Sequence, residues 1–325
     1  MTNGVMIGRF NPFHSSHFKI VEKALSICDK LYIAIGSANV SGTLKNPMNV
    51  FDREKYIKDY ITVNICKPEL LERIEFIYLD DFIHDHDFFN ELAYLIRKYE
   101  INYMFGHKKN DGSSDWVNEF YKAPRLNSPE YIDVETGDDT SSTMLRQRVL
   151  DGHDVGNYDW SSYREYAKKI KEYNNQFVHP YCSVSTHLTV DLIIEEVYSK
   201  KILLIKRNKG FGSGKYAMIG GFVEPNETLE NAIIRECFEE IGFYISAFIK
   251  SNSYSTMLVD NPVRSDRGRI ITQVYKISLD TLGVNSIENN FKENDEVSEL
   301  IWVDKELFNS VIKYNTFEDH AILID

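Results

Sequence analysis

The feature that most constrains the fold is the junction between a short apolar run and the polar segment after it. The apolar run is Val5–Ile7, and it is followed by Gly8-Arg9-Phe10-Asn11-Pro12-Phe13-His14-Ser15-Ser16-His17. We predict a strand that ends here and a helix over residues 15–27. The unpaired N–H groups and the dipole of a first helical turn stabilise an anion. His14 and His17 share one helix face and can donate hydrogen bonds to it. The junction therefore predicts a phosphate site, with two ordinary half-buried histidines as the alternative.

A second polar segment, Thr140-Ser141-Ser142-Thr143-Met144-Leu145-Arg146, precedes a predicted helix over residues 142–150. By itself, such a cluster is typical of a helix N-cap. Together, the two segments resemble the G-R-F-x-P-x-H-x-G-H and I-S-S-T-x-x-R motifs of nucleotidyltransferases, with departures at Ser16 and Thr140. The resemblance implies catalytic roles for His14, His17 and Arg146. It also implies an ATP and phosphate site made of Gly8, Arg9, Phe10, Ser142, Thr143 and Arg146.

Between these motifs, short apolar runs alternate with helical stretches. The predicted strands are Leu31–Ile35, Ile74–Leu79, Tyr103–Phe105 and Tyr131–Val134, and the predicted helices are Asp52–Ile61, Phe88–Lys98 and Trp116–Tyr121. This alternation predicts an α/β domain, a Rossmann-like doubly wound parallel sheet with right-handed crossovers. Such a sheet binds its ligand at the carboxyl ends of the strands, where both motifs lie.

Two internal segments concern the acceptor of the nucleotidyl group. Lys45–Pro47 with Phe51–Glu54, and Gly106–Lys109 with Ser113–Ser114, resemble motifs of nicotinamide mononucleotide (NMN) adenylyltransferases. Polar loops that lead into helices are the alternative. The resemblance implies that Phe88, Phe89 and Lys109 bind NMN, although core packing is an alternative for at least one of the two rings. We interpret the nearby His84-Asp85-His86-Asp87 as a solvated loop rather than a metal site.

The second half of the chain carries Gly221–Glu227 and Arg235–Phe243. Leu229, Ile233, Cys237 and Ile241 repeat every four residues and predict the buried face of a helix that Gly242 ends. Glu236 and Glu240 flank this apolar stripe, so we expect their carboxylates to be held inward. Carboxylates gathered in this way suit hard divalent cations, which predicts Mg²⁺ with Mn²⁺ as the alternative.

These residues fill every fixed position of the Nudix box, G-x5-E-x7-R-E-U-x-E-E-x-G-U. The resemblance implies that the metal ligands are Glu236, Glu239, Glu240 and the carbonyl of Gly220, and that Arg235 orients a glutamate. It also places the general base outside the box. Glu293, Asp295 and Glu296 are the candidates before the predicted strand at 300–303, and we favour Glu296.

A basic segment, Asp260-Asn261-Pro262-Val263-Arg264-Ser265-Asp266-Arg267-Gly268-Arg269, suggests the Nudix substrate. It resembles the D-x-P-x-R-D-P-R-G-R stretch of Nudix ADP-ribose pyrophosphatases and departs from it at Ser265 and Asp266. Arginine forms bidentate bonds with phosphate. The resemblance therefore implies that Arg264, Arg267 and Arg269 bind ADP-ribose, with a solvated basic loop as the alternative.

The length of 325 residues and the 43% apolar content fit two domains. We predict a nucleotidyltransferase domain over residues 1–173, a linker over 174–181 and a Nudix α/β/α sandwich over 182–325. The full pattern resembles the bacterial bifunctional NMN adenylyltransferase/Nudix ADP-ribose pyrophosphatase family. The resemblance implies that ATP and NMN give NAD and pyrophosphate, and that ADP-ribose gives AMP and ribose 5-phosphate. The alternatives are another acceptor, such as nicotinate mononucleotide, and a Nudix domain that only senses ADP-ribose.

Charge and cysteine content limit the partners and the compartment. The net charge of −12 argues against a nucleic-acid surface, so the expected partners are small anionic molecules. The four cysteines have no metal-binding spacing and are expected to be reduced. We see no signal peptide and no long apolar run, so we expect a cytoplasmic protein without membrane association. A monomer and a homo-oligomer are both compatible with the sequence.

Overall fold

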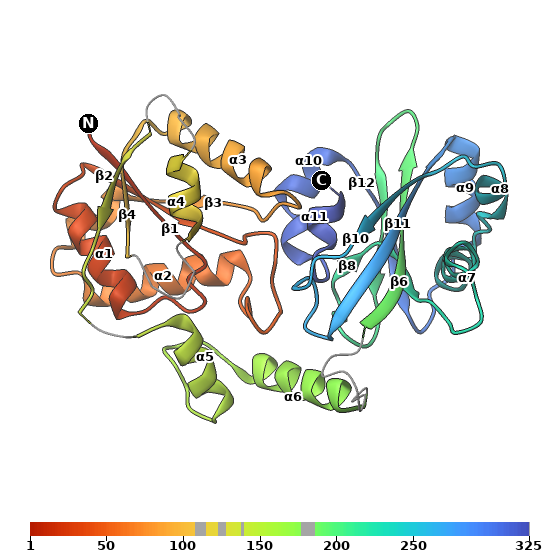
Figure 1. Ribbon diagram of the computed structural model, residues 1–325, viewed down its shortest axis with the longest axis horizontal. Helices are drawn as coiled ribbons and strands as arrows, with labels where there is room; N and C mark the ends of the chain where they lie inside the picture. The colour runs from red at the N-terminus through yellow and green to blue at the C-terminus, as the bar shows by residue number, and fades with distance from the viewer. Residues whose placement is uncertain (108–114, 123–127, 138–139, 177–185, 325) are drawn as a thin grey trace. The chain divides into compact units, whose positions relative to one another are not determined.

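The computed structural model describes residues 1–324 apart from 108–114, 123–127, 138–139 and 177–185 (Figure 1). The chain forms two compact units, Met1–Glu165 and Tyr166–Asp325. Their boundary falls inside helix α6 (Ser161–Gln176). The predicted linker began at residue 174, but α6 continues to Gln176, so its first three residues are helical. One reason is that the second half of α6 packs on its own unit, where Tyr173 contacts Phe211.

The first unit contains a five-stranded parallel sheet in the order β3-β2-β1-β4-β5. The strands are β1 (Asn3–Gly8), β2 (Lys30–Ile35), β3 (Ile74–Tyr78), β4 (Ile101–Gly106) and β5 (Glu130–Asp133). The helices are α1 (Ser15–Leu25), α2 (Val50–Asn64), the 3-10 helix η1 (Pro68–Arg73), α3 (Asp85–Lys98), α4 (Asp115–Lys122) and α5 (Ser142–Leu150). The prediction of a doubly wound parallel sheet is confirmed.

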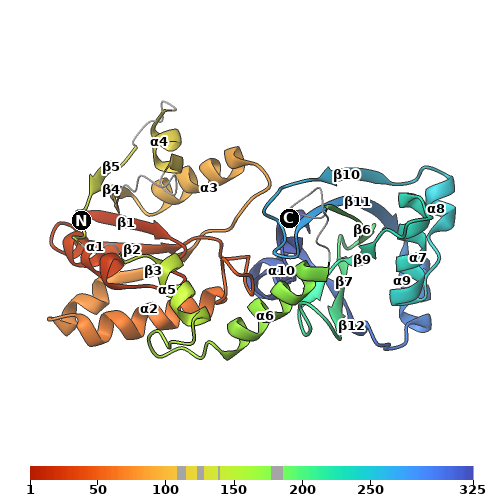
Figure 2. The same cartoon turned by 60° about the horizontal axis from the view of Figure 1, so that its bottom comes forward.

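Side chains of the first sheet form a shared core with the helices that cover one of its faces. Val5, Tyr32 and Ala34 pack in one cluster with Leu92 of α3 and Phe120 of α4. Figure 2 shows α3 and α4 on one side of this sheet and α2 on the other. The strand order reverses between β1 and β4, so the carboxyl ends of these two strands form the topological switch point where such sheets bind ligands.

Arg53 of α2 is a buried residue that links two loops at the carboxyl end of the sheet. Its side chain is fully buried, and its guanidinium donates to the carbonyl oxygens of Arg9 at 3.0 Å, Gly36 at 2.6 Å and Ser37 at 2.8 Å. Burial lowers the pKa of Arg53 to about 10, which still leaves the guanidinium charged at neutral pH. One cation therefore joins the loops that follow β1 and β2.

The second unit is a seven-stranded sheet with the order β10-β11-β6-β7-β12, while β8 pairs with β7 and β9 pairs with β6. The strands are β6 (Thr186–Glu196), β7 (Ile202–Arg207), β8 (Tyr216–Ala217), β9 (Ile219–Phe222), β10 (Ser255–Val259), β11 (Arg269–Leu279) and β12 (Val297–Val303). The helices are α7 (Leu229–Ile241), α8 (Ser246–Lys250), α9 (Thr281–Asn290), α10 (Lys305–Ser310), the 3-10 helix η2 (Ile312–Asn315) and α11 (His320–Ile324).

The apolar face of helix α7 packs against this sheet. Ile233, Cys237 and Ile241 are buried against residues of β6, β7 and β11, and Leu229 packs beside them. Helix α7 ends at Gly242, which has a φ of 70°, a backbone conformation that favours glycine. Helices α7, α8 and α9 lie on one face, and α10 and α11 lie on the other (Figure 1). The predicted α/β/α sandwich is confirmed.

Within the part of the chain that the structure describes, no helix is both long enough and apolar enough to cross a membrane. The thiols of Cys28, Cys66 and Cys237 are free.

Replacing Arg53 with Met removes the donors while it keeps an unbranched stem. We expect the first unit to lose about 3 kcal/mol of its free energy of unfolding, because several buried carbonyls lose their partner. Hydrogen exchange measured by mass spectrometry should then show the amides of β1 and β2 exchanging roughly 100-fold faster. Peptides from β6 and β9 are the internal reference, and exposed Arg97→Met is the matched control. Equal protection of β2 in the two variants would contradict the prediction.

Candidate active sites

The turn after β1 is shaped by one glycine and one buried aromatic ring. Phe10 is 2% exposed and has a φ of 51°, which is unusual for a bulky residue. Its ring lies directly against Gly8, where a Cβ atom would come within 2.7 Å of it. The absence of a side chain at Gly8 therefore allows the turn that leads the chain into α1.

The two histidines of the first motif meet at the start of α1. The ring centroids of His14 and His17 are 3.7 Å apart, and His14 is 4% exposed. The rings of Phe10 and Phe13 lie 5.0 and 5.3 Å from that of His17 and hold it from two sides. The structure thus brings both predicted imidazoles together at the helix N-terminus beside the switch point of the sheet.

Three cations gather at the same end of the sheet. Desolvation and the nearby Arg146 charge lower the pKa of Arg9, and desolvation together with Arg9 and Arg146 lowers the pKa of Lys45. Arg146 therefore disfavours the charged forms of both Arg9 and Lys45. The carboxylate of Asp81, held by the Ser37 hydroxyl at 3.0 Å, opposes this repulsion at Arg9 and Lys45. Such a cluster favours a polyanion such as a triphosphate.

Hydrogen bonds from Ser142 and Arg146 tie the second motif to the first, and another lies within the second motif. The Ser142 hydroxyl donates to the Pro12 carbonyl at 2.9 Å, and Arg146 donates to the Asn11 carbonyl at 2.7 Å and to the Thr143 hydroxyl at 3.1 Å. Ser141 caps α5 by accepting from the Met144 N–H at 3.2 Å. The predicted start of α5 at Ser142 is confirmed, and its N-terminus adjoins the turn after β1.

The residues predicted to bind NMN fall into two groups. Phe88 and Phe89 are half-buried and pack with the α3 and α4 core, where the Phe88 ring lies 5.8 Å from that of Trp116. Their role in stacking on a nucleotide stays a prediction. Lys109 lies outside the described residues. Trp116 is not among the stacking residues predicted from the sequence.

In the second unit, one arginine gathers the acidic residues of the Nudix box. Arg235 donates to Glu227 at 3.1 and 2.6 Å, to Glu236 at 2.8 Å, to Glu239 at 2.9 Å and to the Phe222 carbonyl at 3.0 Å. This arrangement agrees with the predicted orienting role of Arg235. It also fixes the start of α7 to the end of β9.

Glu240 lies deepest among these carboxylates. It is 4% exposed and accepts a hydrogen bond from the Gly220 N–H at 3.0 Å. Burial, together with the charges of Glu236 and Glu296, raises the pKa of Glu240 well above its usual range, while Arg207 opposes the shift. The carboxylate of Glu236 lies against Gly221, where a Cβ atom would come within 2.5 Å of its Oε1. Gly221 thus lets the backbone of β9 approach the Glu236 carboxylate, while the Gly220 N–H binds Glu240.

The candidates for the general base separate in the structure. The carboxylate of Glu296 lies near enough to Glu236 and Glu240 to raise the pKa of each, after the effect of burial. Asp295 forms an ion pair with Lys209 at 3.6 Å, and the exposed Glu293 is no cause of either shift. The structure therefore brings Glu296 to the carboxylate group, and its role as base stays a prediction.

A divalent cation fits the chemistry of this donor set. Glu236, Glu240 and Glu296 repel one another, all the donors are oxygen atoms, and the glycines leave backbone exposed beside them. As placed, no three His, Cys, Asp or Glu side chains among the described residues form a group that could hold an ion, and Arg235 binds two of the carboxylates. Binding of a cation would thus draw Glu236 and Glu239 from Arg235.

The predicted ADP-ribose arginines are already engaged by acidic residues. Buried Arg264 donates to both oxygens of Asp319 at 2.9 and 2.8 Å, and Arg267 donates to Glu318 at 3.1 and 2.8 Å. Arg269 lies near Asp260. The Arg267 guanidinium also lies over the rings of Phe317, Phe222 and Phe211, with centroid distances of 5.2, 5.6 and 5.9 Å. The alternative of a solvated basic loop is wrong for Arg264, because that side chain is buried.

The sequence analysis missed several residues that shape the two sites. Lys45 was noted only as part of a loop motif, and Asp81, Arg207, Glu318, Asp319 and His320 were not considered. An Asp-Asp pair directly after a predicted strand was an available signal for Asp81. No pattern near the C-terminus marked Glu318 or Asp319, because their partners lie more than 50 residues earlier in the chain.

The fold and these two clusters define a protein with a nucleotidyltransferase-type domain followed by a Nudix-type domain. Residues 5–148 match the profile of the cytidylyltransferase-like family, and residues 185–323 match that of the NUDIX domain. The chain belongs to the Nudix family, and its domain order confirms the predicted resemblance to the bifunctional adenylyltransferase/Nudix family.

Two relatives and one solved structure show the extent of this similarity. An ADP-ribose pyrophosphatase of Methanocaldococcus jannaschii is 35% identical over 147 residues, 43% of this chain and 75% of that protein. A nicotinamide-nucleotide adenylyltransferase of Pyrococcus horikoshii is 45% identical over 53 residues, so the match spans 16% of this chain and only 28% of that relative. A bifunctional NMN adenylyltransferase/ADP ribose pyrophosphatase from Francisella tularensis shares the fold, with a TM-score of 0.75, 24% identity and coverage of 99% of this chain and 97% of that chain.

The buried position of His320 predicts that acid lowers the stability of the second unit. Burial, aided by Arg264, lowers the pKa of His320 to about 4, and its Nδ1 accepts from the Met218 N–H at 2.9 Å. The unfolded chain protonates His320 near its ordinary pKa of about 6.5, whereas the folded chain resists until about 4. The unfolded state therefore binds more protons in this window, and stability falls as the pH falls through it.

We expect His320→Asn to reduce this acid sensitivity, because asparagine keeps an acceptor near Nδ1 but does not titrate. Hydrogen exchange of β6 and β9, corrected for intrinsic rates, should lose protection between pH 6.5 and pH 4 less steeply than in the parent chain. Exposed His153→Asn is the matched control. Parallel pH profiles for the parent chain and His320→Asn would contradict the prediction that His320 causes this acid sensitivity.

Proposed function

We propose that the first domain transfers AMP from ATP to NMN, giving NAD and pyrophosphate, and that the second hydrolyses ADP-ribose to AMP and ribose 5-phosphate. The observation that carries the proposal is the presence, in one chain, of a histidine pair beside a cation cluster at the switch point and of a complete Nudix carboxylate set. The functions of the relatives from Methanocaldococcus and Pyrococcus support the same pair of substrates.

At the first site, a phosphate oxygen of NMN attacks the α-phosphorus of ATP, and the bond from that phosphorus to the bridging oxygen of pyrophosphate breaks. Arg9, Lys45 and Arg146 are placed to neutralise the triphosphate and the leaving pyrophosphate. His14 and His17 at the start of α1 donate hydrogen bonds to the reacting phosphoryl group. The protein needs no covalent intermediate, because positioning and charge stabilisation suffice for an in-line transfer.

The acceptor pocket is the less determined part of the first site. Phe88, Phe89 and Lys109 are our candidates for binding NMN, and Trp116 joins them because its ring lies against that of Phe88. A stacked aromatic ring does not distinguish a carboxamide from a carboxylate. Nicotinate mononucleotide is therefore the second acceptor to test.

At the second site, Glu236, Glu239, Glu240 and the Gly220 carbonyl would hold Mg²⁺ or Mn²⁺. When bound, such a cation neutralises the diphosphate and lowers the pKa of a coordinated water. The Glu296 carboxylate accepts the proton of the attacking water, and the basic loop with Arg264, Arg267 and Arg269 binds the substrate. Among the three, we favour Arg267, because its guanidinium lies over the rings of Phe222 and Phe317, which are candidates for stacking on the substrate.

Two substitutions should separate the activities. His17→Ala should lower the kcat of NAD synthesis at least about 100-fold and leave ADP-ribose hydrolysis unchanged, because an interaction with the transition state is lost. Glu240→Gln should do the reverse. Chromatography of products from ATP with NMN, and separately from ADP-ribose, with Mg²⁺ present, measures both reactions in one preparation.

The same assay decides between the alternatives. Loss of both activities in either variant would contradict independent sites. NAD formation without AMP formation from ADP-ribose by the parent chain would favour a sensing Nudix domain. A higher rate with nicotinate mononucleotide than with NMN would replace the proposed acceptor.

Lys45→Met should raise the KM for ATP about tenfold with a smaller change in kcat, because a charge-assisted contact to phosphate is lost. Steady-state kinetics at saturating NMN measures this effect. Lys55→Met removes an exposed lysine from α2 and is the matched control. An unchanged KM for ATP in the Lys45 variant would remove Lys45 from the proposed triphosphate site.

A further inference from the structure

The segment Phe317–His320, just before and at the start of α11, contacts β8 and the residue that joins β8 to β9, the strand that carries the glycine pair Gly220–Gly221. The Phe317 N–H donates to the Tyr216 carbonyl at 2.8 Å, and Tyr216 forms an isolated parallel bridge with Thr316. The His320 Nδ1 accepts from the Met218 N–H at 2.9 Å. Met218 lies two residues before Gly220, so this segment fixes the approach of β9 to the Nudix carboxylates.

The two carboxylates of the same segment hold the basic loop. Asp319 accepts two hydrogen bonds from Arg264, and Glu318 accepts two from Arg267 and one from the Ser265 hydroxyl at 2.5 Å. The side chains of Glu318 and Arg264 are 6% and 3% exposed. Such buried pairs are strongly coupled, because removing one partner leaves an uncompensated charge.

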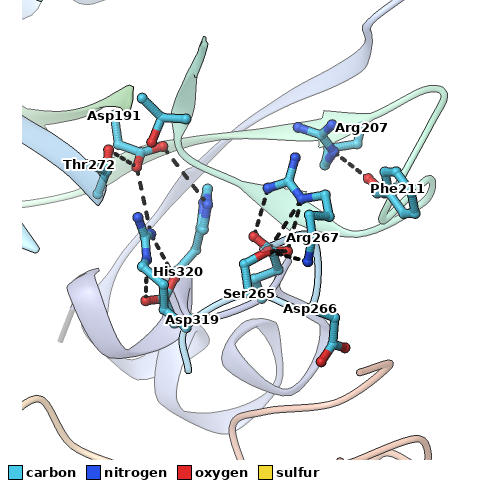
Figure 3. A network of polar contacts seen from close by, with 12 residues as sticks. Asp191, Arg207, Phe211, Ser265, Asp266, Arg267, Thr272, Asp319 and His320 are labelled. Atoms are coloured by element: carbon cyan, nitrogen blue, oxygen red, sulfur yellow. Dashed lines mark hydrogen bonds and ion pairs between the residues drawn. The ribbon is translucent and has the colours of Figure 1, made fainter. Parts of the chain in front are cut away.

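A third set of contacts connects the segment to the middle of the sheet. Asp191 of β6 accepts from the Thr272 hydroxyl at 2.7 Å and lies 3.9 Å from both the Arg264 Nη2 and the His320 Nε2. Figure 3 shows Asp191 and Thr272 facing His320 and Asp319, with Arg267 and Ser265 beside them. Asp191 is also the β6 residue opposite Gly220 in the β6–β9 pairing. The network therefore meets both the basic loop and the glycine strand.

We infer that Phe317–His320 is a positioning segment of the Nudix site, in which His320 sets the Gly220 carbonyl and Glu318 sets the Arg267 guanidinium. This inference rests on the proposed hydrolase function. It assigns two separable effects to neighbouring residues. His320 acts through β9, which carries the proposed metal ligand Gly220, and Glu318 acts through Arg267, which is proposed to bind the substrate.

The test compares His320→Leu, His320→Asn, Glu318→Gln and Glu195→Gln in the full chain. Asparagine keeps an acceptor for the Met218 N–H, and leucine removes it. Glu195 of β6 forms ion pairs with Lys276 at 2.9 Å and with Lys200 at 3.2 Å. Glu195→Gln is therefore the matched control for the loss of a paired carboxylate. Three quantities are measured: kcat and KM for ADP-ribose, the affinity for Mn²⁺ alone by calorimetry, and NAD synthesis as a check on the other domain.

For His320→Leu we expect an affinity for Mn²⁺ and a kcat that are each lowered about 10- to 100-fold, with most of the loss restored in His320→Asn. For Glu318→Gln we expect a KM for ADP-ribose raised about tenfold, with kcat and Mn²⁺ affinity unchanged. Glu195→Gln and NAD synthesis should match the parent chain.

Three results would overturn the inference. One is an unchanged KM in Glu318→Gln. Another is His320→Asn as impaired as His320→Leu. The third is a loss of kcat in His320→Leu that matches the unfolded fraction, measured by hydrogen exchange, with normal Mn²⁺ affinity. A parent chain that fails to hydrolyse ADP-ribose overturns the proposed substrate instead, and Mn²⁺ binding to the His320 variants still decides the role of His320.

Discussion

Both sites depend on holding like charges close together against their own repulsion. In the first unit, the charge of Arg146 lowers the pKa values of Arg9 and Lys45, and in the second, the charge of Glu296 raises those of Glu236 and Glu240, in each case in addition to the effect of burial. Such clusters are costly unless a ligand of opposite charge offsets them. The repulsion is therefore a sign of function: one cluster suits a triphosphate, and the other suits a divalent cation.

Beside each cluster lies one arginine that makes several hydrogen bonds. Arg53 donates to backbone carbonyls and joins the loops after β1 and β2. Arg235 donates instead to carboxylates and to a carbonyl at the end of β9. The planar guanidinium suits both tasks because it offers five donors in a rigid arrangement. The difference in partners matters: neutral carbonyls leave the positive charge of Arg53 in place, and carboxylates neutralise that of Arg235.

Local patterns predicted most of the fold and part of each site. The predicted helix at 142–150 agrees with α5 in both bounds, and the four-residue repeat through Cys237 identified the buried face of α7. These signals succeed because helix caps and amphipathic faces act within one or two turns. The predicted linker residues Asn174–Gln176 are helical instead, since the packing of Tyr173 on Phe211 extends α6 beyond its sequence signal.

The motifs alone indicate which chemistry the chain carries, because the residues of the histidine turn and those of the Nudix box each lie within one short stretch of the sequence. The contacts that restrain those residues become visible in the folded chain. The pairs Arg264–Asp319 and Arg267–Glu318, and the bond from Met218 to His320, join positions separated by 55, 51 and 102 residues. No local pattern encodes such pairs, because burial in the same interior brings their charges together and makes each partner necessary to the other.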